Sequence, residues 1–172
     1  MSDINISLLA KNQNFLKFEI AENFSCIRFL DYNKERFELE FNLEKGTSFN
    51  TFLIRNNEEL FIIHPPEKQY LNSFNEIISN FFNQYKLKKI NVISGHINPQ
   101  IIETIKNVSK QFQDLTITCS NPGFKLISEL WNQRNPNLKE FVEIQLPKIN
   151  IVKKELNLEL DNISLELIPI PT

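Results

Sequence analysis

The feature that most constrains the fold is a central block in which helix and strand patterns alternate. Apolar residues spaced three and four apart run through Leu71–Tyr85 and again through Ile101–Phe112, which is typical of helices with one buried face. Each helix is followed by a short apolar run, Ile90–Ile93 and Leu115–Cys119, that reads as a buried strand. This order predicts an α/β fold, in which sites form in the loops after the carboxyl ends of the strands.

The loop after the first of these strands holds the strongest candidate site. His96, Asn98 and Gln100 stand there at alternate positions, with the outline of a metal-binding H-x-[DE]-x-[DE] loop. Iron and hard cations need carboxylate or imidazole ligands, whereas neutral amides coordinate weakly and Ile101 cannot coordinate at all. The sequence therefore predicts the shape of a metal site without its ligands.

Further strand patterns lie on both sides of the central block. Four are expected before it and three after it, at Phe24–Leu30, Arg36–Phe41, Ser48–Ile54, Glu59–His64, Phe141–Leu146, Leu156–Leu160 and Ile163–Ile168. A hairpin turn at Glu44–Gly46 is expected to pair the second of these with the third. The first helix is expected to begin at Pro65–Pro66, and Ser120 or Asn121 is expected to cap a helix that carries Leu126–Trp131.

The length of 172 residues suggests one domain with a core of its own, or part of a larger domain. Residues 1–22 are weakly periodic and are expected to form an N-terminal arm with a strand near Phe15–Ile20, followed by a domain over residues 23–172. No signal peptide and no apolar run of about 18 residues is recognisable, so a cytoplasmic protein without a membrane partner is expected. The formal net charge of −2 gives no overall attraction to nucleic acid.

Other candidate chemistry is weak. Cys26 and Cys119 lie in apolar strands and are expected to be buried thiols. His64 ends a strand and is interpreted as a structural residue, although it could face one cleft with His96. No Ser/His/Asp set, no Cys/His pair with the context of a nucleophile and no phosphate-binding glycine loop is found, so no catalytic or cofactor-binding residue is assigned.

Several segments in this order resemble the N-terminal region of the flavodiiron proteins, and most closely the cyanobacterial diflavin flavoproteins. The segments are Ile27-Arg-Phe-Leu-Asp-Tyr32, Arg36-Phe-Glu-Leu-Glu-Phe41, Gly46-Thr-Ser-Phe-Asn-Thr-Phe-Leu-Ile54 and the loop of His96. The resemblance covers roughly residues 20–172. It implies a metallo-β-lactamase-like αββα sandwich, of which about half of the second sheet would be missing, leaving exposed apolar strand edges.

The resemblance also implies that the loop of His96 has lost metal ligands. The family's loop reads His-x-Glu-x-Asp-His and binds a diiron centre; His96 matches the first histidine, while Asn98, Gln100 and Ile101 stand at the other ligand positions. His96 is therefore interpreted as a vestigial metal ligand. The family's remaining ligands follow the counterpart of Leu165–Thr172, and its FMN and flavin reductase domains follow those.

Members of the family reduce dioxygen to water, or nitric oxide, with electrons from NAD(P)H through flavin. For this chain the resemblance implies a truncated, ligand-depleted relative that binds neither iron nor flavin and is inactive alone. Some cyanobacterial and plant members with neutral loop residues are thought to work beside a complete subunit. The expected partner is therefore a complete flavodiiron subunit, in oxygen photoreduction and electron transport, or a second copy of this chain. The alternatives are the N-terminal fragment of a full diflavin enzyme and an independent ligand-binding module.

Overall fold

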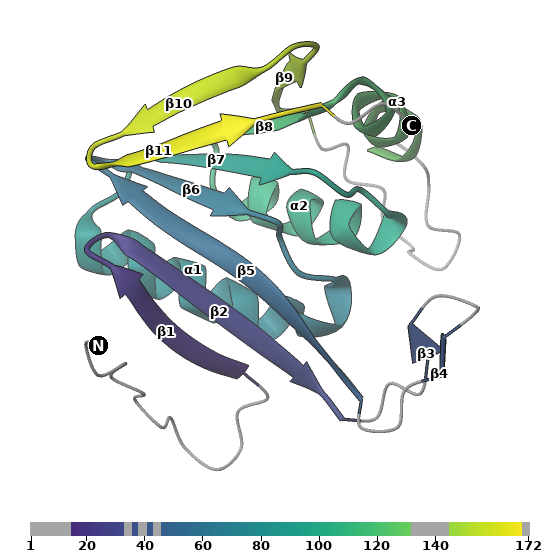
Figure 1. Ribbon diagram of the computed structural model, residues 1–172, viewed down its shortest axis with the longest axis horizontal. Helices are drawn as coiled ribbons and strands as arrows, with labels where there is room; N and C mark the ends of the chain where they lie inside the picture. Colours follow the sequence, from purple (N-terminus) through teal and green to yellow (C-terminus); the bar gives the residue numbers. More distant parts are fainter. Residues whose placement is uncertain (1–14, 33–35, 38–40, 43–45, 132–144, 170–172) are drawn as a thin grey trace.

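A computed structural model describes residues 15–32, 36–37, 41–42, 46–131 and 145–169 (Figure 1). Within them, seven strands form a mixed sheet in the order β1-β2-β5-β6-β7-β8-β9. Their bounds are β1 Phe15–Ala21, β2 Phe24–Asp31, β5 Thr47–Asn56, β6 Glu59–Ile63, β7 Lys89–Ser94, β8 Leu115–Ser120 and β9 Lys148–Val152. The neighbours from β1 to β6 are antiparallel, and those from β6 to β9 are parallel.

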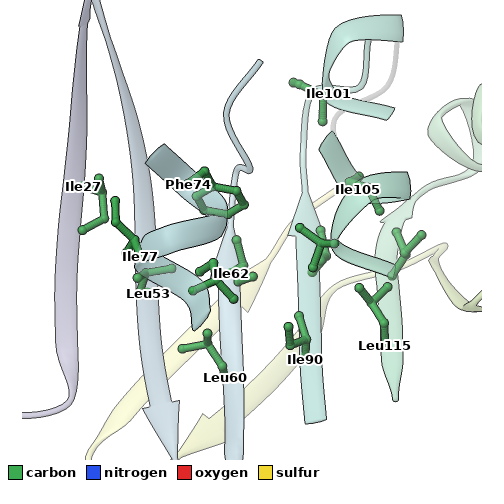
Figure 2. Close-up of a cluster of buried hydrophobic side chains, with 14 of the residues drawn as sticks. Ile27, Leu53, Leu60, Ile62, Phe74, Ile77, Ile90, Ile101, Ile105 and Leu115 are labelled. Atoms are coloured by element: carbon green, nitrogen blue, oxygen red, sulfur yellow. The ribbon is translucent and has the colours of Figure 1, made fainter. Parts of the chain in front are cut away.

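Helices cover one face of this sheet. They are a 3₁₀ turn at Lys68–Tyr70, α1 (Leu71–Tyr85), α2 (Pro99–Gln111) and α3 (Asn121–Trp131). Figure 2 shows the core on this face, where Phe74 and Ile77 of α1 and Ile101 and Ile105 of α2 gather with isoleucines and leucines of the strands. The apolar stripes predicted for the first two helices are therefore confirmed as core.

A hairpin covers part of the opposite face. It consists of β10 (Leu156–Leu160) and β11 (Ile163–Leu167), joined by a turn in which Asp161 has a φ of 57°. Its inner side chains, including buried Leu160, pack on Ile54, Phe61 and Ile93, which face away from the helices because side chains alternate along a strand. The described part thus has the helix–sheet–sheet layering of the expected metallo-β-lactamase-like α/β fold.

Most of the predicted elements are present. The strand expected near Phe15–Ile20 is β1, and because it pairs with β2 along its length, residues 15–21 belong to the sheet. Ser120 caps α3, accepting a hydrogen bond from the Gly123 N–H at 3.3 Å, as one of the two expected caps. Both cysteines are buried and free, as predicted.

The expected hairpin between residues 36–41 and 48–54 is wrong. The partner of β5 is β2, with eight residue pairs from Phe24↔Ile54 to Asp31↔Thr47. The intervening β3 (Arg36–Phe37) and β4 (Phe41–Asn42) pair only with each other. The pairing of β2 with β5 is preferred over the hairpin that the local turn pattern predicts, because two largely apolar strands that pair over a long register bury more surface than a short hairpin can.

Two further expectations need correction. The first helix begins at Leu71, after the 3₁₀ turn at Lys68–Tyr70, rather than at Pro65–Pro66. Pro65 stands before another proline, a position at which helical geometry is disfavoured. The strand β9 was not predicted; it is parallel to β8 and closes one edge of the sheet. The strand expected at Phe141–Leu146 lies mostly outside the described residues, as do 38–40 of the second strand and part of the Glu44–Gly46 turn.

Candidate functional site

A cavity of about 680 Å³ lies at the carboxyl ends of β7 and β8, the position at which α/β folds build sites. Its walls are the loop of residues 94–97, the first turns of α3, and residues 166–169 at the end of the hairpin. Figure 1 shows β11 ending on the same side of the molecule as the end of β7 and α3. The site is therefore built from the loop that the sequence singled out and from two elements far from it in the chain.

His96 lines this cavity, and its side chain is exposed. Its backbone carbonyl accepts a hydrogen bond from the Ser94 hydroxyl at 2.7 Å, which fixes the turn between β7 and the loop. The expectation that His64 shares this cleft does not hold, because His64 is not among the residues that line the cavity.

His64 has a structural environment of its own. Its ring stacks on Phe49, with centroids 4.8 Å apart and planes 10° apart. The backbone N–H of His64 donates to the Ile93 carbonyl, and the backbone carbonyl of His64 accepts from the Thr51 hydroxyl, both at 2.8 Å. Burial lowers the pKa of His64, and the charge of nearby His96 lowers it further, so the ring favours its neutral form.

Two of the three other loop positions have side chains that serve the folding of α2. The Asn98 side chain is the N-cap of the helix, where its Oδ1 accepts from the Ile101 N–H at 2.9 Å. Ile101 is fully buried in the core (Figure 2). Gln100 is exposed in the first turn of the helix, and its carbonyl accepts from the Thr104 hydroxyl at 3.4 Å. Two of the three side chains are thus committed to capping and packing.

The described residues do not supply a donor set for paired irons. Among them, no three His, Cys, Asp or Glu side chains lie together in a way that could hold one metal ion. Cys119 lines the cavity, but burial raises the pKa of its thiol to about 11, which opposes the thiolate that a metal requires. Glu166 is the one carboxylate of the lining. That the ligand positions of this loop are degenerate stays a prediction.

Sequence reasoning missed two residues of the cavity. Thr118 lies on the sheet face toward the hairpin, and Glu166 comes from β11. The alternation in Leu115-Thr-Ile-Thr-Cys119 was the available signal for Thr118, because it places both threonines on the face opposite the helices. No local signal could have brought Glu166 to the loop of His96, since that contact depends on how the hairpin folds over the sheet.

The chain shares this architecture with solved structures of other proteins. The fold is similar to the metallo-β-lactamase-like core of the flavodiiron proteins. The chain superposes on a metal-soaked flavodiiron core from Synechocystis sp. PCC6803 with a TM-score of 0.69 at 23% identity, over 87% of this chain and 34% of that one. It also superposes on the 1–254 fragment of diflavin flavoprotein A 5 from Nostoc sp. PCC 7120 with a TM-score of 0.68 at 26% identity, over 88% of this chain and 55% of that one.

The amino-acid sequence is similar to those of the diflavin flavoproteins. The chain is 33% identical over 105 residues to diflavin flavoprotein A 6 from Nostoc sp. (strain PCC 7120), a match that covers 60% of this chain and 18% of the relative. The match to diflavin flavoprotein A 1 from Thermosynechococcus vestitus is 27% identical over 115 residues. No family model matches the chain. The predicted resemblance to flavodiiron proteins of the diflavin type is therefore confirmed, over about a fifth of the length of these relatives.

In the described part, no helix is long and apolar enough to cross a membrane.

Proposed function

We propose that this chain is a flavodiiron-type domain without a working diiron centre, and that it acts as a protein partner of a complete flavodiiron subunit. The observation that carries the proposal is the role of two residues in the loop of His96: Asn98 caps α2 and Ile101 fills the core. These positions correspond to metal ligands in the loop of the flavodiiron proteins that this chain resembles. One exposed imidazole with a neutral amide beside it is too weak a donor set for two irons. On this proposal the chain alone does not reduce oxygen.

The pairing role is supported by the sheet face that the hairpin leaves uncovered (Figure 1). Alternation along β1 places Leu16 and Phe18 on this face, and Ile20, at the register shift between Glu19 and Ala21, is 51% exposed. Phe24 and Phe52, whose rings are 6.1 Å apart, lie on the same face of the neighbouring strands. Because large contiguous apolar patches mark protein interaction sites, we propose this face as the pairing surface.

Metal content tests the first half of the proposal. The protein is expressed in iron-supplemented medium, purified without chelator and analysed for iron per chain. We expect far less than one iron per chain and no oxygen consumption with NADPH and flavin. About two irons per chain would refute the proposal, whatever the activity, because the protein would then bind the diiron centre that the proposal denies it.

Co-purification tests the second half. The tagged protein is co-expressed with a diflavin flavoprotein of the same host, and we expect the two to co-purify. The variant Ile20→Glu should weaken this pairing, because it places a charge in the apolar face; the control Lys110→Glu, on an exposed position of α2, should not. Equal recovery with both variants would contradict the assignment of this face.

A second candidate function is that these residues are the first part of a diflavin enzyme. It is favoured by the comparison itself, because the matched residues make up only 18% of diflavin flavoprotein A 6. Sequencing the transcript beyond the codon of Thr172 tests it. An in-frame continuation with further histidine and aspartate ligands and a flavodoxin-like domain would favour the enzyme over the partner role.

A further inference from the structure

The cavity beside His96 has the size and the walls of a small-molecule site. Its volume of about 680 Å³ falls within the roughly 300–1,000 Å³ of typical ligand pockets. Most of its lining is apolar, contributed by Ile93, Ile97, Pro122, Leu126, Val152, Leu167, Ile168 and Pro169. It would therefore bury the apolar surface of an organic molecule.

The charges around the cavity restrict what such a molecule can be. No lysine or arginine is among the lining residues, and the one carboxylate is that of Glu166. A phosphate or carboxylate group would have to leave water for a mostly apolar cavity and lie beside the negative charge of Glu166, with the exposed imidazole of His96 as the one side chain of the lining that can become cationic. Phosphorylated cofactors such as flavin mononucleotide and nicotinamide nucleotides are accordingly disfavoured here.

One polar group inside the cavity is placed to anchor a ligand. Thr118 is only 7% exposed and lines the cavity, so its hydroxyl can reach a molecule bound there. The neighbouring hydroxyls are partly engaged, since Ser94 donates to the His96 carbonyl and Ser120 accepts from the Gly123 N–H. The Thr118 hydroxyl therefore offers a ligand one hydrogen-bonding point in a mostly apolar wall, which is the usual composition of a small-molecule site.

We propose that this cavity binds an uncharged, predominantly apolar organic molecule, with a carbonyl or hydroxyl group hydrogen-bonded to the Thr118 side chain. The inference does not depend on the pairing role, because the cavity is lined by α3, the loop of residues 94–97 and the end of the hairpin, away from β1. It also requires no metal.

The test uses Nile red, an uncharged apolar dye with one carbonyl group, in a fluorescence titration of the purified protein. We expect saturable binding of one dye per chain, which flavin mononucleotide does not displace. Thr118→Val removes the hydroxyl and keeps the shape, so it should weaken binding by about three- to tenfold, the usual effect of one hydrogen bond. The matched control is Thr116→Val, which is equally buried on the same face of β8 but does not line the cavity.

A blocking variant separates this cavity from other apolar surfaces of the protein. A Cβ atom added at Gly95 meets nothing within 4 Å, so Gly95→Trp can be accommodated by the fold while its ring occupies the cavity or its mouth. Dye binding should fall by more than tenfold, with the melting temperature of the free protein little changed. The proposal is overturned if Thr118→Val and Gly95→Trp both bind the dye as the wild type does, or if flavin mononucleotide competes with it.

Discussion

Replacing Ile101 by histidine asks directly whether this position is a metal-ligand position or a core position in this protein. Ile101 is completely buried on α2, in the cluster that Figure 2 shows. Removing a buried isoleucine forfeits about 1.5–3 kcal/mol of transfer free energy. An imidazole in its place buries an N–H without a partner, at a further cost of about 1–3 kcal/mol. We therefore expect Ile101→His to lower the free energy of unfolding by about 2.5–6 kcal/mol.

The loss should also depend on pH in a defined direction. Burial disfavours the charged imidazole, so the pKa of the introduced histidine should be lower in the folded than in the unfolded protein. The unfolded state then binds more protons below a pH of about 6.5, and the destabilisation should grow as the pH falls, by up to about 1.4 kcal/mol per pH unit.

Urea unfolding followed by circular dichroism, at pH 8 and pH 5.5, measures both effects. Ile101→Val is the control and should cost about 0.5–1.5 kcal/mol without a new pH dependence. The reasoning fails if Ile101→His costs less than 1 kcal/mol, or if ferrous or zinc ions restore its stability, because the side chain would then point to a site that can bind a metal.

Three other perturbations have expected outcomes. Asn98→Ala should cost about 1 kcal/mol in urea unfolding through loss of the N-cap of α2, whereas Asn98→Asp, which also accepts from the Ile101 N–H, should cost little; equal losses would argue against the cap. Because the pKa of His64 is lowered in the folded protein, the contribution of His64 to the free energy of unfolding falls as the pH drops below about 6.5. His64→Asn should therefore flatten the dependence of stability on pH between pH 7 and pH 5, since asparagine tolerates the left-handed backbone at this position. An NMR titration of the wild type should give His64 a midpoint below 6.5. Gly46→Ala should lower the melting temperature markedly, because Gly46 has a φ of 74° and a Cβ atom there would run into the backbone of Asp31; an unchanged melting temperature would show that this turn can move aside.

The sequence by itself determined the order of elements in the central block. The periodicity of Leu71–Tyr85 and Ile101–Phe112 and the short apolar strands after each helix are local patterns, and each was found where it was predicted. That the loop of His96 lacks metal ligands is likewise a local interpretation, because amides and an isoleucine are poor metal ligands in any fold, and it stays a prediction. The resemblance to diflavin flavoproteins added the class of fold.

Tertiary structure alone decided how the strands pair and what surrounds the loop. β5 pairs with β2 across an intervening segment, against the local turn signal, because register depends on burial summed over the whole strand. Thr118 and Glu166 meet the loop of His96 only because parallel strands bring their carboxyl ends to one edge of the sheet and the hairpin folds over it. Such contacts join residues about 20 to 70 positions apart, and no local pattern along the chain records them.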